Sequence, residues 1–107
     1  MMSIPAGKPH REISSGEMLK HFLEEMEITP YRLAKETEIS HATISRILSD
    51  EARITPIIAL KFAAFFENTP QFWLNCQNLW DLANVGKKVE KSLRRIKPYS
   101  SLVLTTV

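Results

Sequence analysis

The chain has 107 residues, a formal net charge of +2 and an ordinary share of apolar residues. This length is enough for one domain with a modest core and too short for two. No run of about 18 apolar residues occurs and the first residues form no apolar stretch, so we expect no membrane partner and no signal peptide. The single cysteine, Cys76, has no partner for an intrachain disulfide, which fits a cytoplasmic location.

Five helices are predicted from apolar residues at helical spacing and from side chains that cap a helix start. Thr-Pro pairs begin the second, fourth and fifth helix, because threonine caps a helix and proline fits its first position. Serines begin the first and third. The expected ranges are about 16–27, 30–37, 41–48 and 56–67, and from 70 past Lys88. The fold class is therefore all-α.

Other segments are less regular. Residues 1–13 carry prolines and a glycine and are interpreted as an extended or mobile arm. Residues 98–107 are rich in β-prone side chains, so this tail is either disordered or added as a strand to a partner's sheet. We expect an arm at 1–13, a domain at 14–86 and a basic helical extension with an apolar tail at 87–107. The inner face of the fourth helix is predicted to consist of Ile57, Leu60, Ala63, Ala64 and Phe66.

Residues 29–50 have the pattern of a helix-turn-helix, whose second helix enters the DNA major groove. Apolar residues at 33, 34, 39, 44 and 47 face inward, and the second helix opens on small polar side chains. Arg46 can reach guanine O6 and N7, and Ala42 or Thr43 can touch a thymine methyl group. Any capped amphipathic helix also shows a polar outer face. The predicted base-reading residues are His41, Ala42, Thr43, Ser45 and Arg46.

Candidate phosphate contacts surround this unit. Arg53 comes just before the helix start at Thr55, and a cation beside a helix N-terminus suits a phosphate group. Ser40 begins the third helix and is a candidate phosphate contact for the same reason. Tyr31 and Arg32, in the first turn of the second helix, are further candidates. The alternative for these side chains is ordinary surface polarity.

A helix-turn-helix head pairs with a second copy to reach two half-sites about one helical turn of DNA apart. Large side chains of the fifth helix are candidates for that contact, because aromatic residues are enriched in such interfaces. The alternative is that they belong to the core, and we expect the helix to be divided between the two roles. The predicted interface residues are Trp73, Leu74, Gln77 and Trp80.

Charge is distributed unevenly along the chain. Residues 1–86 hold 8 Lys or Arg against 11 Asp or Glu, whereas residues 87–97 hold six against one. Non-specific DNA affinity follows the number of phosphates neutralised, so a single copy of the acidic part should bind DNA weakly. The basic run either contacts DNA, meets an acidic protein surface or is solvated.

The sequence resembles a known family beyond the helix-turn-helix pattern itself. The resemblance is carried by the stretches at residues 16–19, 45–48, 53–55 and 73–82. Together they resemble the HigA antitoxins, a branch of the Cro/CI-type (XRE) repressors, over about residues 15–85. The resemblance implies a five-helix, lambda-repressor-like DNA-binding domain, here with a helical C-terminal extension. It also implies a homodimer that represses its own operon on double-stranded operator DNA and neutralises a HigB-type, mRNA-cleaving toxin.

Two positions depart from that family. Glu38 stands in the turn where glycine is usual, so it either adopts a positive φ that costs about 1 kcal/mol or the turn differs. Thr37 stands where leucine is common, which thins the core.

No catalytic, metal or cofactor site is predicted. The three histidines are not at metal-ligand spacing, and no nucleophile is paired with a base. The first hypothesis is therefore a HigA-like antitoxin and autorepressor rather than an enzyme. The alternatives are a stand-alone XRE-type transcriptional regulator without a toxin and a module that binds only protein.

Overall fold

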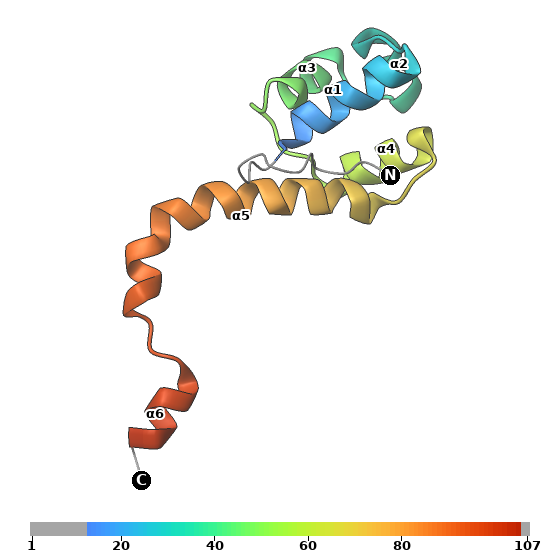
Figure 1. Ribbon diagram of the computed structural model, residues 1–107. Helices are drawn as coiled ribbons and strands as arrows, with labels where there is room; N and C mark the ends of the chain where they lie inside the picture. The colour runs from blue at the N-terminus through green and yellow to red at the C-terminus, as the bar shows by residue number, and fades with distance from the viewer. Residues whose placement is uncertain (1–12, 106–107) are drawn as a thin grey trace.

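The computed structural model describes residues 13–105, which form six α-helices and no strand (Figure 1). The all-α prediction is confirmed for this part of the chain. The predicted arm lies outside the described residues except for Ile13. The helices are α1 (Ser15–Met26), α2 (Pro30–Thr37), α3 (His41–Leu48), α4 (Pro56–Phe66), α5 (Pro70–Arg95) and α6 (Tyr99–Thr105).

Side-chain caps define the helix starts, as predicted. Thr29, Thr55 and Thr69 each precede a proline at the first helical position and accept a hydrogen bond from the third backbone N–H of their helix. Ser14 begins α1 with a capping box, because its hydroxyl accepts from Glu17 N while the Glu17 carboxylate accepts from Ser14 N. Local chemistry therefore accounts for where these helices begin.

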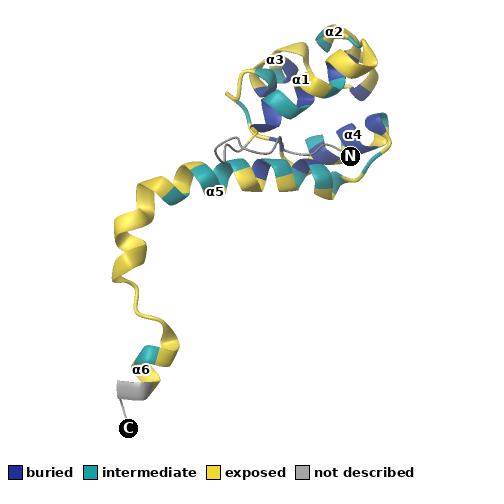
Figure 2. Cartoon of the chain, in the orientation of Figure 1, coloured by how far each residue is buried: buried dark blue, intermediate teal, exposed yellow. Residues whose placement is uncertain are grey.

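The core is built from buried residues of α1, α2, α3, α4 and the first half of α5, and it includes the fully buried Trp73. The Trp73 ring lies 5.0 Å from the Phe22 ring and 5.1 Å from the Phe62 ring, measured between centroids. Its indole N–H donates to Asn68 Oδ1 at 3.0 Å. Figure 2 shows the buried residues concentrated in α1–α4 and the first half of α5, which together form the five-helix head. The distal part of α5 is exposed.

The inner face predicted for α4 is only partly correct. Ile57 is 67% exposed and Leu60 is 59% exposed, whereas Ala59 and Phe62 are fully buried. Lys61 is the only charged residue of α4, so apolar periodicity could not distinguish its faces. The aromatic packing against Trp73 decides the orientation instead. Of the predicted residues, Ala63 and Phe66 face the core and Ile57, Leu60 and Ala64 do not.

The C-terminal segment is helical, so the expectation that it is disordered or adds a strand to a partner's sheet is wrong for residues Tyr99–Thr105. α5 runs for 26 residues and continues through residue 86 without a break, then bends in its second half (Figure 1). Residues from Tyr99 form α6. Because the described residues offer no sheet edge, this segment satisfies its backbone groups locally, as in the bond from Ser101 N to Pro98 O at 3.0 Å. None of the described helices is long and apolar enough to cross a membrane.

A buried amide joins three parts of the head. Gln77 of α5 accepts from Ile54 N at 2.9 Å and from the Ser15 hydroxyl at 3.1 Å. Its own amide donates to Asp81 Oδ1 at 3.1 Å. The start of α1, the loop after α3 and the middle of α5 are therefore held at one point.

The start of α1 also approaches the end of α3 very closely. Gly16 N donates to Asp50 Oδ1 at 3.1 Å, and a Cβ placed on Gly16 would lie 2.7 Å from the Leu48 carbonyl oxygen. Only glycine fits there without moving backbone. Gly86 of α5 has nothing within 4 Å of such a Cβ.

Gly16→Ala is expected to lower the free energy of unfolding by about 2 kcal/mol, because the added methyl meets backbone carbonyls that cannot rotate away. Gly86→Ala is the matched control and should keep or raise helix content, since alanine is the better helix former. Chemical denaturation followed by circular dichroism measures both. Equal stability of the two variants would contradict the close approach of α1 and α3.

Candidate nucleic-acid interface

The α2–turn–α3 unit is built by two helix caps and a tight turn. Thr29 Oγ1 accepts from Arg32 N and Ser40 Oγ accepts from Thr43 N, each at 3.1 Å. Between the helices, Ile39 is buried and its N–H donates to Ala34 O at 3.2 Å. The turn therefore holds α3 against the core and leaves its opposite face outward.

Of the two conformations expected for the turn, the structure shows the one in which Glu38 adopts a positive φ. Its φ of 57° lies in the left-handed region. The same is true of the residues that follow α1 and α4, Glu27 and Glu67. The Lys61 ammonium donates to the Glu38 carbonyl at 3.2 Å and so helps to hold the turn. Thr37 is buried, but its hydroxyl donates to Leu33 O at 2.7 Å, so the polar group is satisfied.

The predicted base-reading residues lie on the outer face of α3. His41, Ala42, Ser45 and Arg46 are exposed, and Thr43 is half-buried. The Ser40 hydroxyl donates to Thr43 Oγ1 at 2.8 Å, which orders the first turn. A short, ordered helix start followed by an exposed arginine is the arrangement that reads base edges in a major groove.

The starts of α2 and α3 lie next to each other. The ring of Tyr31 is 70% exposed and its centroid lies 6.0 Å from that of His41. The first turn of a helix favours a phosphate group, because its backbone N–H groups lack carbonyl partners within the helix. The structure therefore brings Tyr31 and Ser40 together with the base-reading face.

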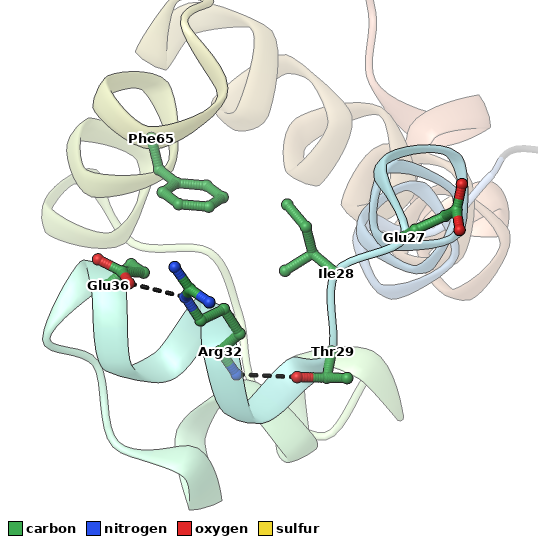
Figure 3. Close-up of a pocket in the computed structure, with 6 residues that line it drawn as sticks. All are labelled: Glu27, Ile28, Thr29, Arg32, Glu36 and Phe65. Carbon is green, nitrogen blue, oxygen red and sulfur yellow. Dashed lines mark hydrogen bonds and ion pairs between the residues drawn. The ribbon is translucent and has the colours of Figure 1, made fainter.

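Arg32 has a different position from its neighbour Tyr31. Its Nε lies 2.7 Å from Glu36 Oε2, and both side chains line a pocket with Ile28, Thr29 and Phe65 (Figure 3). Phe65 belongs to α4, so Arg32 points toward that helix rather than toward His41. Its predicted phosphate contact would require a different rotamer and the loss of an exposed ion pair, which costs little.

Arg53 and Thr55 lie at the start of α4, on the loop that follows α3. Arg53 Nη1 lies 2.6 Å from Asp81 Oδ2, and the arginine side chain remains 63% exposed. Asp81 is in turn held by Gln77. The guanidinium is therefore anchored on one side and open to solvent on the other, while Thr55 caps α4 by accepting from Ile58 N.

The interface residues predicted on α5 fall into two groups. Trp73 is fully buried and Gln77 is 5% exposed, so both are covered by their own protomer and the prediction that they meet a partner is wrong. They were assigned from residue type, whereas their packing depends on contacts with α1 and α4. Leu74 and Trp80 are half-buried and remain interface candidates. Further along α5, the apolar side chains of Leu79, Leu82, Val85, Val89 and Leu93 are also exposed.

Cys76 lies between these groups on α5. Burial raises the pKa of the Cys76 thiol, which keeps it protonated and unreactive near neutral pH. Among the described residues, no group of three His, Cys, Asp or Glu could hold a metal ion.

Fold and exposed face together define a helix-turn-helix DNA-binding protein. A family model of the Cro/C1-type HTH DNA-binding domain matches residues 18–71. The chain is 38% identical over 89 residues to the protein named antitoxin HigA-1 of Vibrio cholerae, covering 82% of this chain and 84% of that relative. The chain therefore belongs to the HigA family of antitoxins, which are DNA-binding proteins and not enzymes.

Solved structures agree with this assignment. An addiction module antidote protein of the HigA family from Coxiella burnetii has a TM-score of 0.80 and 35% identity, covering 84% of this chain and all of that one. The Pseudomonas aeruginosa antitoxin HigA, solved with the higBA promoter, has a TM-score of 0.78 and 31% identity, covering 83% of this chain and 99% of that one. The five-helix, lambda-repressor-like fold is confirmed.

Glu38→Gly is expected to raise the free energy of unfolding by about 0.5–1 kcal/mol, because glycine adopts a positive φ without strain. The matched control is Glu25→Gly on the exposed face of α1, where glycine should lower it by about 1 kcal/mol. Urea denaturation of both variants supplies the numbers. A loss of stability in Glu38→Gly would mean that the turn is not strained.

Proposed function

We propose that this chain is the antitoxin of a two-gene module and that it represses its own operon as a homodimer. Its exposed α3 face and capped helix starts support binding to double-stranded operator DNA. The P. aeruginosa relative was solved with the promoter of its own genes, which supports the same role here. The observation that carries the proposal is the ordered start of α3 with Arg46 exposed one turn later. A cytoplasmic location, without a membrane partner, belongs to this proposal.

The charge of the head supports dimer formation. With residues 1–86 holding 8 basic against 11 acidic side chains, one head has few cations to neutralise phosphates. Two heads linked by a two-fold axis would double the phosphate contacts and read both halves of a palindromic operator about 34 Å apart. In each head, Arg53, Tyr31 and the capped starts at Ser40 and Thr55 provide the grip on the backbone.

Thr43→Ala combined with Arg46→Ala should weaken operator binding by at least about 100-fold, because both removed side chains face the base edges. Arg94→Ala, which removes one arginine far from α3, is the control and should bind within about twofold of the wild type. Fluorescence anisotropy with the DNA upstream of the gene measures both, and unfolding curves verify the fold. Unchanged affinity of the double variant would exclude α3 as the reading helix.

Toxin binding is the second part of the proposal. An mRNA-cleaving HigB-type toxin must present a basic surface to RNA. Glu24, Glu25 and Glu27 are exposed at the end of α1 and offer a complementary acidic surface.

Co-expression with the neighbouring reading frame should yield a stable complex and relieve the growth arrest that the neighbour causes alone. The variant Glu24→Lys with Glu25→Lys should weaken that complex, while Lys20→Glu on the same helix should not, because it adds negative charge. If no neighbouring protein binds, the chain acts as a stand-alone XRE-type regulator. If operator binding is also absent and weak DNA affinity shows no salt dependence, the protein-only module is the better account.

A further inference from the structure

A pair of rings lies on the outer surface where α2 and α3 begin. Tyr31, the second residue of α2, and His41, the first residue of α3, have ring centroids 6.0 Å apart and ring planes inclined at 51°. Rings attract each other at this separation. Every other ring contact among the described residues belongs to the core or packs against it. Within the described part of the chain, the Tyr31–His41 contact is therefore the one that core packing does not explain.

The fold does not depend on this contact. Tyr31 is 70% exposed, and His41 is exposed as well. The start of α2 is capped by Thr29 and the start of α3 by Ser40, so both helices begin without help from the rings. Removing an exposed side chain that caps nothing changes stability little. The consequence of the contact is instead local, because the Tyr31 ring restricts where the His41 ring can lie.

The position of the His41 ring matters for reading a base. A neutral imidazole has one donor and one acceptor nitrogen, and a hydrogen bond weakens steeply when it is bent. In the same turn of α3, the Thr43 hydroxyl is already held by the Ser40 hydroxyl at 2.8 Å. With Tyr31 beside His41, both polar side chains have a fixed neighbour before any DNA arrives. A side chain that is ordered before binding loses less conformational freedom on binding.

We propose that Tyr31 is a positioning residue that holds the His41 ring in place to read a base pair of the operator. The inference rests on the operator binding proposed above and adds a second role for Tyr31 besides its phosphate contact. The two roles use different parts of the side chain, because the hydroxyl meets the phosphate and the ring meets His41. Specificity at one base pair thus depends on a residue of α2 as well as on α3.

The test compares Tyr31→Phe with Tyr31→Ala in the full chain, each with His41 present and each combined with His41→Ala. Both variants lack the hydroxyl, so the difference between them reports the ring alone. Fluorescence anisotropy with the DNA upstream of the gene gives each dissociation constant. With His41 present, Tyr31→Ala should bind about five- to tenfold more weakly than Tyr31→Phe, because the freed imidazole must be ordered on binding. Without His41 the two should agree within about twofold.

A second measurement separates positioning from a general loss of structure. Operators with single base-pair changes are bound by the same variants, and unfolding curves verify the fold. His41→Ala and Tyr31→Ala should lose discrimination at the same base pair, while Tyr31→Phe keeps it. In the unbound chain, Tyr31→Ala should shift the NMR resonances of the His41 ring protons far more than Tyr31→Phe does. A ring that only supports α2 would instead lower affinity for every operator alike.

Each outcome decides the proposal. A difference between Tyr31→Phe and Tyr31→Ala that persists in His41→Ala would overturn it, because the ring would then act on the DNA or the fold directly. Equal binding by the two variants with His41 present, or equal shifts of the His41 resonances, would overturn it as well. Either result alongside a tight wild-type complex refutes the positioning role alone. A wild-type chain that does not bind the operator would refute the proposed function and this role with it.

Discussion

The head depends on one buried amide, that of Gln77. It accepts from Ile54 N and from the Ser15 hydroxyl and donates to Asp81, so it joins three segments that are distant in sequence. An amide can do this because its oxygen accepts two hydrogen bonds while its nitrogen donates. Within the described residues, every buried side-chain nitrogen or oxygen has a hydrogen-bond partner, and Gln77 makes two of the buried long-range bonds. The position of α3 relative to α5 follows from it.

This junction also shows how far the sequence alone could reach. Helix starts were predicted closely because Thr29, Ser40 and Thr69 act on N–H groups within three residues of themselves. Gln77 was instead assigned to a partner surface, since its bonds to positions 15 and 54 cross 62 and 23 residues. The face of α4 was unpredictable for a related reason, because its almost uniformly apolar sequence leaves the choice to tertiary packing. The tail is β-prone by propensity, but residues Tyr99–Thr105 form a helix, and the part of the chain that the structure describes has no strand with which they could pair.

In the candidate site, the residues suited to reading bases differ from those suited to binding phosphates. The outer face of α3 offers small polar side chains and a single arginine, which suits the reading of base edges more than the neutralisation of phosphates. The charge of Arg53 is partly neutralised by Asp81, which accepts a hydrogen bond from the Gln77 amide. Because residues 1–86 hold 8 basic against 11 acidic side chains, one head should bind operator DNA weakly, which supports the homodimer proposed above.

Gln77 holds the loop after α3 and the α5 helix as one rigid unit. Native-state hydrogen exchange of the Ile54 amide tests it most directly, because that N–H is buried and its acceptor is the Gln77 side chain. We expect this amide to exchange only on global unfolding, as slowly as the amides in the middle of α4. Exchange of Ile54 at the rate of an exposed loop amide, while α4 remains protected, would show that Gln77 does not hold the loop in place.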